Sequence, residues 1–231
     1  MRIRFICLAN SRKLAGRCVA GLRLDRDEWV RPVSEDSEGT LLRRHYVLDD
    51  GNEAALLDII EVNVSEHRPK PYQPENWVLE NKQWKLIKRL NPREAYMLLE
   101  RSLVSAPDLF GNTSDRVPLA GLQNNPVPGS LVLIKPTDVS WYIVRSITGK
   151  RQTRALFSLN RATYDLAITD PVWEQRLKNL DFGVHSREAV DVRSDDILLF
   201  TISLGGPFQG QCYKLIAGII LIPEFLSQGD S

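Results

Sequence analysis

The first third of the chain alternates apolar and polar residues with a period of two, which is typical of β-strands with one buried face. This pattern predicts strands over Arg2–Ala9, Arg17–Asp25 and Glu28–Val33, and a longer strand over Leu56–Glu66. The segment Leu41–Leu48 fits either a strand or a helix.

The alternation returns in the second half of the chain. It predicts strands over Ser130–Lys135, Ser140–Ser146, Arg154–Leu159, Thr163–Ala167, Asp196–Ser203 and Gln211–Ile222. These runs are rich in β-branched and aromatic residues, and turn residues such as Gly205 and Gly206 separate them.

Two helix starts stand out between the strands. Asn91 is a good N-cap, Pro92 suits the first helical position, and Glu94 can complete a capping box, so we expect a helix that runs to about Val104. Asp170 followed by proline predicts a second helix by the same logic.

Strands, then a helix, then two strands is the order of a five-stranded Greek-key barrel of the OB type. We therefore expect a mainly β fold with a few helices, built from two OB-like Greek-key barrel units packed together. Residues 1–106 would form the first unit with its C-terminal helix, and residues 129–231 the second. The proline- and glycine-rich stretch 107–128 is the expected junction.

The composition is that of an ordinary globular protein, with 43% hydrophobic and 26% charged residues. The net charge of +1 excludes a strongly basic protein that coats nucleic acid. Charge is nevertheless segregated: residues 1–32 are mainly basic, whereas the charged residues of 35–66 are acidic apart from Arg43 and Arg44. A local basic surface results only if this segregation survives folding.

The densest group of candidate ligand contacts lies in a predicted hairpin loop, where Asn10, Ser11, Arg12 and Lys13 precede Arg17. Arg and Lys neutralise phosphates, and Asn and Ser hydrogen-bond to phosphates or base edges. The alternative is a loop whose polar side chains merely face water.

Two further groups combine aromatic and basic residues. Trp29 and Arg31 share one side of a strand, where the aromatic ring would stack on a base and the guanidinium would bind its phosphate. The alternative is a core Trp beside an arginine in a structural ion pair. Trp141 and Tyr142 point to opposite sides of a strand, so one of these rings faces outward, and we take Tyr142 as the candidate for stacking. The basic hairpin turn that follows holds the remaining candidates, Lys150, Arg151 and Arg154, and the alternative is a turn whose basic side chains are simply solvated.

Catalytic signatures are missing from the sequence. Cys7, Cys18 and Cys212 have no paired spacing, and no metal-ligand spacing, glycine-rich phosphate loop or nucleophile motif occurs. We expect no enzyme activity, no cofactor and no metal site. A metal-dependent hydrolase built on Asp49, Asp50 and Asp58 is the less favoured alternative to a solvated acidic loop.

Several sequence blocks resemble a known family. They are ICLANSRKLAGRCVAG, WVRPVS, YQPENW, ITDP and SLGGPFQGQCYKLIAGII, and they occur in order between Ile6 and Ile222. On these blocks the chain resembles the bacterial dual OB-containing domain, DuOB. The resemblance implies two OB-like units and a nucleic-acid-binding role, and it implies no catalytic residues.

The sequence thus predicts a non-catalytic module that binds single-stranded nucleic acid or a nucleotide through its basic loop and aromatic-bearing barrel surface. The alternative is a protein-interaction module, or a sensor of a small anionic ligand, that does not bind polynucleotides. No run is long and apolar enough to span a membrane and no signal peptide is visible, so we expect a cytoplasmic protein.

Overall fold

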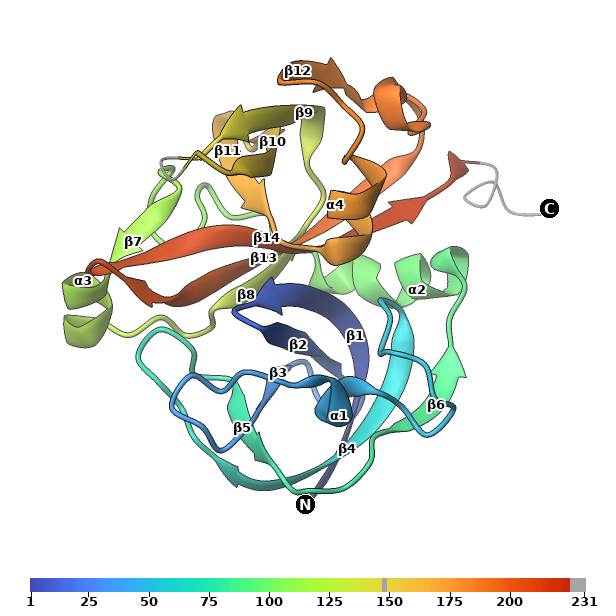
Figure 1. The fold of residues 1–231 in the computed structure, drawn as a ribbon, viewed down its shortest axis with the longest axis vertical. Helices are drawn as coiled ribbons and strands as arrows, with labels where there is room; N and C mark the ends of the chain where they lie inside the picture. Colours follow the sequence, from blue (N-terminus) through green and yellow to red (C-terminus); the bar gives the residue numbers. More distant parts are fainter. Residues whose placement is uncertain (147–148, 225–231) are drawn as a thin grey trace.

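The computed structural model describes residues 1–146 and 149–224, and its strands form two sheets that pack against each other (Figure 1). The first sheet contains β1 (Arg2–Lys13), β2 (Gly16–Arg23), β3 (Trp29–Val33), β4 (Asp58–His67), β5 (Asn76–Leu79) and β6 (Lys85–Arg89). Its strands follow the order β1-β2-β3-β5-β4, and β4 pairs back onto β1. This is a closed five-stranded barrel in which β3 and β5 are parallel.

The second sheet repeats this order. It contains β8 (Leu131–Ile134), β9 (Thr137–Arg145), β10 (Arg151–Leu159), β11 (Ala162–Ile168), β13 (Ile197–Phe208) and β14 (Gln211–Ile222) in the order β9-β10-β11-β14-β13-β8. Only Lys135 and Pro136 separate β8 from β9, so these two strands act as one bent strand that joins both ends of the sheet. The expected fold of two OB-like barrels is confirmed.

The remaining strands lie at sheet edges: β7 (Arg116–Pro118) pairs with β14, and β12 (Gly183–Ser186) pairs with β9. The helices are α1 (Arg43–Tyr46), α2 (Pro92–Leu99), α3 (Leu119–Asn124) and α4 (Pro171–Arg176), with 3-10 turns η1 (Glu100–Ser102) and η2 (Arg187–Val190). Among the described residues, none of these helices has the length and apolar character needed to cross a membrane.

Both predicted helix starts are confirmed. The Asn91 side chain accepts a hydrogen bond from the Glu94 amide at 2.9 Å, and Asp170 caps α4 by accepting from the Val172 amide at 2.9 Å. The first helix is shorter than predicted, because α2 ends at Leu99 and continues as the 3-10 turn η1. The ambiguous segment Leu41–Leu48 contains the one-turn helix α1.

Two predicted loops are strands. β1 extends through Lys13, because its polar end pairs with β2 from Asn10 opposite Val19 to Lys13 opposite Gly16, which leaves a turn of Leu14 and Ala15. The basic turn predicted after Tyr142 is likewise shorter, since β10 begins at Arg151. Cross-strand pairing, which local hydrophobicity does not encode, extends both hairpins. The short strands β5 and β6 were not predicted.

The two barrels share a hydrophobic core. Ile6 and Leu8 of β1 pack in one buried cluster with Leu133, Leu199 and Ile220 of the second sheet. The hydroxyl of Thr201 in β13 donates to the Leu8 carbonyl at 2.6 Å. In Figure 1, β13 and β14 cross the middle of the molecule beside β1. The barrels are therefore held together by buried apolar side chains and a hydrogen bond between strands.

The charge segregation of the sequence is largely cancelled by folding. Arg4 of β1 lies opposite Glu61 of β4, and the two side chains form an ion pair at 2.8 Å. Arg17 likewise approaches Glu53 at 3.7 Å. Pairing of a basic strand with an acidic strand thus neutralises much of the basic N-terminal region.

The close approach of the barrels depends on Gly218. A Cβ at this position would lie 2.3 Å from the Leu8 carbonyl oxygen, closer than any real contact allows. We expect Gly218→Ala to lower the free energy of unfolding by about 1–3 kcal/mol, as for other overpacked cores, measured by urea denaturation. Gly121→Ala in α3 is the control, because nothing lies within 4 Å of its added Cβ and stability should not fall. Equal losses in both variants would contradict this account of the interface.

Candidate ligand-binding cavity between the barrels

A buried ion pair lies where the two barrels meet. The side chain of Arg31 in β3 is 2% exposed, and its Nε donates to Glu75 at 2.8 Å. Its Nη2 reaches the second barrel, where it donates to the hydroxyls of Ser130 at 2.9 Å and Ser203 at 3.2 Å. Glu75 also accepts from the Ser130 amide at 3.2 Å. Charged and polar groups of both barrels thus form one network.

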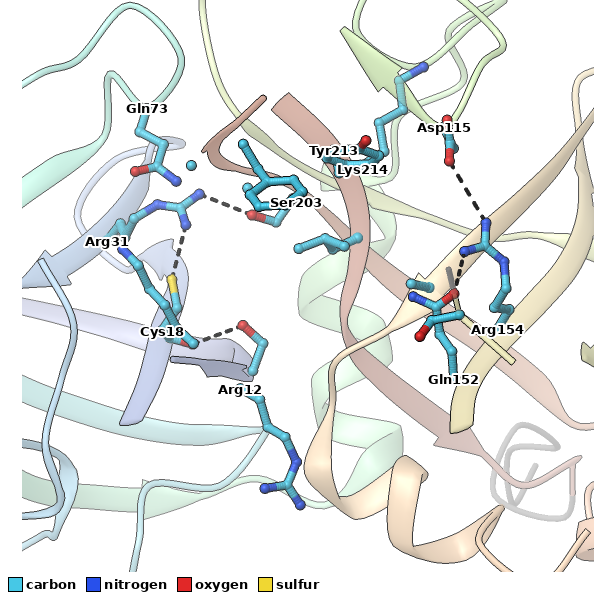
Figure 2. Close-up of a pocket in the computed structure, with 18 residues that line it drawn as sticks. Arg12, Cys18, Arg31, Gln73, Asp115, Gln152, Arg154, Ser203, Tyr213 and Lys214 are labelled. Carbon is cyan, nitrogen blue, oxygen red and sulfur yellow. Dashed lines mark hydrogen bonds and ion pairs between the residues drawn. The ribbon is translucent and has the colours of Figure 1, made fainter. Parts of the chain in front are cut away.

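A cavity of about 470 Å³ opens beside this network. Figure 2 shows Arg12, Cys18, Arg31 and Gln73 on its first-barrel side and residues of the second barrel opposite them. The described residues that line it are Ser11, Arg12, Lys13, Cys18, Arg31, Gln73, Asp115, Ser146, Gln152, Arg154, Ala167, Ser203, Gly205, Gly206, Phe208, Tyr213, Lys214 and Leu215. We call this space the inter-barrel cavity.

The first barrel contributes basic side chains from the end of β1. Arg12 forms an ion pair with Glu174 of α4, and its amide donates to the Thr169 carbonyl at 2.8 Å. The ammonium of Lys13 donates to the Glu38 carbonyl. Burial lowers the pKa of Lys13, and the positive charge of Arg31 lowers it further. An anion bound here would counter both effects.

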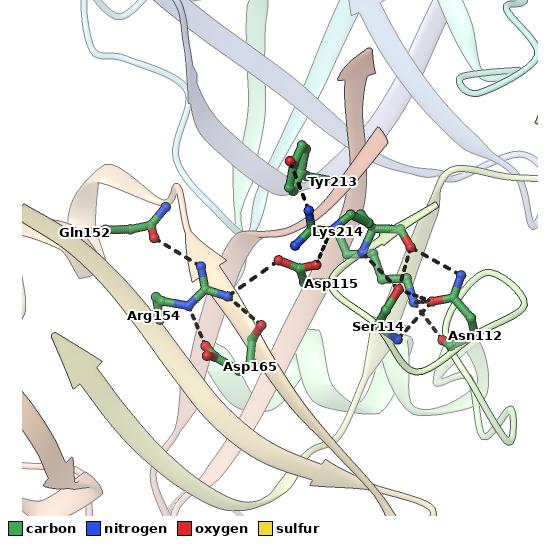
Figure 3. Close-up of polar contacts among 9 residues, drawn as sticks. Asn112, Ser114, Asp115, Gln152, Arg154, Asp165, Tyr213 and Lys214 are labelled. Carbon is green, nitrogen blue, oxygen red and sulfur yellow. Dashed lines mark hydrogen bonds and ion pairs between the residues drawn. The ribbon is translucent and has the colours of Figure 1, made fainter. Parts of the chain in front are cut away.

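The second barrel contributes Arg154 and two aromatic rings. Arg154 donates to Gln152 at 3.1 Å and pairs with Asp165, and it lies 4.0 Å from Asp115 (Figure 3). The ring of Tyr213 lies under the Arg116 guanidinium, 5.0 Å from ring centroid to Cζ. Phe208, which also lines the cavity, is 61% exposed. Guanidinium groups and aromatic rings therefore occur together on this wall.

Lys214 has a different role, although it belongs to the same lining. Its side chain is buried and donates to the Asn112 carbonyl at 2.7 Å and to Asn112 Oδ1 at 2.8 Å (Figure 3). Burial lowers its pKa to about 8, although Asp108 and Asp115 raise it in part. The Lys214 ammonium thus fixes the loop before β7.

The structure brings five of the predicted site residues into the lining of the inter-barrel cavity, namely Ser11, Arg12, Lys13, Arg31 and Arg154. Arg31 lies in a structural ion pair, which was the alternative to a ligand contact, and it also lines the cavity. Ser11, which is buried, donates to the Cys18 carbonyl at 3.4 Å.

The other predicted residues lie outside this lining. Asn10 donates to the Ala54 carbonyl at 2.6 Å, and Arg17 lies over the Tyr46 ring. Trp29 is half-buried and packs against the core between the barrels. Tyr142 is half-buried on the outward side of β9.

Lys150 and Arg151 lie at the β9–β10 hairpin, at one end of the second barrel. Lys150 is exposed, and Arg151 donates to the carbonyls of Leu177 at 3.2 Å and Leu180 at 2.6 Å. Its guanidinium also lies 5.6 Å from the Phe182 ring centroid. Residues 147 and 148 of this hairpin lie outside the described part of the chain.

Four important lining residues were not predicted as contacts: Gln73, Gln152, Ser203 and Tyr213. A signal for three of them was present, because Gln73 lies in the YQPENW block, and Ser203 and Tyr213 lie in the last block of the family resemblance. The blocks that carry the resemblance thus meet at the contact between the barrels, although they lie far apart in the sequence.

Within residues 1–146 and 149–224, no group of three or more His, Cys, Asp and Glu side chains is arranged to hold a metal ion. Of the acidic residues considered for a hydrolase, Asp50 and Asp58 both pair with Arg89, at 2.9 and 3.1 Å.

Comparison with known proteins agrees with this fold. A family model described as the dual OB-containing domain, DuOB, matches residues 3–219. No curated protein matches the sequence at a significant level.

Four chains of solved structures match this chain, and two of them show the level of similarity. One is a chain in the structure of a replication protein A heterotrimer bound to ssDNA, with 13% identity and a TM-score of 0.40 over 97% of this chain and 49% of that one. Another is the tetrameric p202 HIN2, with 8% identity and a TM-score of 0.29 over 96% of this chain and 92% of that one. The present chain spans about half the length of the replication protein A chain. Similarity at this level supports no conclusion about function.

Removing the buried guanidinium tests the network. We expect Arg31→Met to lower the free energy of unfolding by about 3–5 kcal/mol, because the carboxylate of Glu75 would remain buried without its partner. The paired variant Arg31→Met/Glu75→Met should recover part of this loss. Arg43→Met is the control, since Arg43 also pairs with a glutamate but its side chain is 74% exposed. Similar urea midpoints for Arg31→Met and Arg43→Met would contradict a structural role for the pair.

The buried ammonium of Lys214 makes stability depend on pH. Its pKa in the folded protein, about 8, lies below the ordinary value of 10.5, so its charged form costs stability below pH 8. This cost disappears as the pH rises from about 8 to 10.5. Relative to Lys214→Met, the wild-type protein should therefore gain stability across this range in urea denaturation. If the difference in unfolding free energy between the wild-type protein and Lys214→Met does not change with pH, the lowered pKa of Lys214 is refuted.

Proposed function

This chain belongs to the dual OB-containing domain family, and we propose that it is a non-catalytic module that binds single-stranded nucleic acid, with one nucleotide seated in the inter-barrel cavity. OB barrels bind oligonucleotides with their second and third strands and with the loops that follow the first and fourth strands. One observation carries the proposal: these regions of both barrels line the same cavity.

In the first barrel, Cys18 of β2, Arg31 of β3 and Gln73 of the β4–β5 loop line the cavity. In the second barrel, the corresponding regions are β10 with Arg154, β11 with Ala167, and the paired ends of β13 and β14. The two surfaces with which OB barrels bind nucleic acid therefore lie opposite each other. This arrangement supports a ligand held from both sides.

The chemistry of the lining fits a nucleotide. Lys13 offers positive charge for a phosphate, and Arg12 and Arg154 add positive charge that Glu174 and Asp165 partly neutralise. The rings of Tyr213 and Phe208 offer surfaces for base stacking. The volume of about 470 Å³ lies within the range of small-ligand sites. Among the described residues, Asp115 is the one carboxylate of the lining, so a bound anion meets little repulsion.

A free anionic small molecule is the second candidate ligand. It is favoured by one observation, namely that Arg31 and Arg154 are already paired with Glu75 and Asp165 and so have less charge to offer a long polyanion. Binding of such a ligand would depend less on salt than binding of a polynucleotide.

Fluorescence anisotropy of labelled single-stranded DNA and RNA across a salt series tests the proposal. For the wild-type protein, the logarithm of the binding constant should fall linearly with the logarithm of salt concentration. The Arg12→Ala/Lys13→Ala variant should bind more weakly, with a slope shallower by about 1.4, because each lost phosphate contact on a single strand accounts for about 0.7.

The control is Lys82→Ala/Lys85→Ala, which removes the same charge from exposed positions outside the cavity. It should bind like the wild-type protein. Absence of binding at low salt, or equal weakening in both double variants, would overturn the proposal. Saturable binding of a nucleoside monophosphate without binding of oligonucleotides would favour the second candidate.

A further inference from the structure

Beyond the inter-barrel cavity, the outer surfaces of the two barrels are used differently. In the first barrel, side chains of β1, β2 and β3 that point away from its own core pack against the second barrel, among them Leu8, Ala20 and Trp29. In the second barrel, β9, β10, β11 and β12 lie on the far side of β13 and β14 from the first barrel (Figure 1). The outward side of these four strands is therefore the larger surface that the contact between the barrels leaves open.

One row of paired residues leads from the inter-barrel cavity across this open side. Ala167 of β11 pairs with Arg154 of β10, Arg154 pairs with Tyr142 of β9, and Tyr142 pairs with Val184 of β12. Side chains of residues directly opposite each other in paired strands lie on the same side of the sheet. Because Ala167 and Arg154 line the cavity, Tyr142 and Val184 continue its wall outward. We call Arg154, Tyr142 and Val184 the outer row.

The outer row combines a guanidinium with an open apolar surface. Val184 is 59% exposed and Tyr142 is half-buried, and neither belongs to a buried hydrophobic cluster of the described residues. Leu156, on the same side of β10 as Arg154, is likewise half-buried outside these clusters. Packing in the barrel core therefore does not account for these apolar side chains.

The spacing of the row suits consecutive nucleotides of one strand. Neighbouring strands of a sheet are about 4.8 Å apart, so Tyr142 begins one such step from Arg154 at the border of the cavity. The base next to a nucleotide seated in the cavity would lie within reach of the Tyr142 ring. The first barrel offers no equivalent row, because Leu8, Ala20 and Trp29 on the corresponding side are packed against the second barrel.

We propose, on the basis of the nucleic-acid function proposed above, that the single strand leaves the inter-barrel cavity across the second barrel alone. The base that follows the nucleotide in the cavity stacks on Tyr142 and contacts Val184. Stacking on an aromatic ring accepts any base, so this contact adds affinity without sequence preference. The two barrels thus have unequal roles: both enclose the cavity, and the second carries the extended contact.

Anisotropy with a labelled oligothymidylate of eight nucleotides tests this path, at a length within the roughly 4–16 nucleotides that one OB barrel covers. Tyr142→Ala should weaken binding at least about fivefold, because a base loses its stacking partner. The dependence of binding on salt should keep its wild-type slope, because no phosphate contact is removed. Tyr142→Phe retains the ring and should bind like the wild-type protein.

Tyr96→Ala is the matched control, because Tyr96 of α2 is also half-buried but lies outside the cavity lining and the outer row. It should bind like the wild-type protein. Val184→Asp is a second variant, at an exposed position where a carboxylate would repel the strand, and it should also weaken binding. Met97→Asp places the same charge on α2, at a side chain that is 69% exposed, and should have no effect. Urea midpoints check that each variant folds.

The results distinguish this path from the function on which it rests. If the wild-type protein binds the oligonucleotide and Arg12→Ala/Lys13→Ala weakens binding, but Tyr142→Ala and Val184→Asp bind normally, the function stands and the path is wrong. Equal weakening by Tyr142→Ala and Tyr142→Phe would contradict stacking. A wild-type protein that binds no oligonucleotide at low salt would overturn both proposals. A dimer that Val184→Asp converts to a monomer without loss of affinity would assign the outer row to a second copy of this chain instead.

Discussion

The buried contact of Arg31 with Glu75, Ser130 and Ser203 is the interaction on which the arrangement of the two barrels depends. β1 and the second sheet also bury apolar side chains against each other, but apolar packing has little directional preference. A guanidinium that is 2% exposed must find its hydrogen-bond acceptors, and here they come from both barrels. The pair therefore favours one relative orientation of the barrels over others that would bury a similar apolar area.

This orientation creates two cavities, the inter-barrel cavity and a mostly apolar one of about 400 Å³. β1 lies against β14, and its polar end reaches both cavities: Ser11, Arg12 and Lys13 line one, and Asn10 lines the other. The cavities differ in charge because different segments of the second barrel complete them. Gln152 and Arg154 of β10 face the first, whereas Trp173 and Ile220 face the second. A single strand thus separates a polar, basic space from an apolar one.

Much of the fold could be predicted from the sequence, because the local signals agreed with the tertiary structure. The alternating runs gave most long strands, and the caps Asn91 and Asp170 marked the starts of both predicted helices. Predictions failed where pairing with a distant segment decided the structure. β5 has four residues and little pattern of its own, yet it closes the first barrel by lying parallel to β3. The polar end of β1 similarly became a strand through its pairing with β2.

The sequence by itself determined the two-barrel architecture and the concentration of hydrogen-bonding and basic residues at Ser11, Arg12 and Lys13, because alternation, caps and turn residues act locally. Only the tertiary structure decided which charges are neutralised and which side chains share a cavity. Arg4 and Glu61 are 57 residues apart and meet through the β1–β4 pairing. Arg31 and Ser203 are 172 residues apart and meet through the contact between barrels. Contacts between residues so far apart depend on how the strands pair and how the barrels pack. The hydrophobic periodicity of the sequence does not determine either of these.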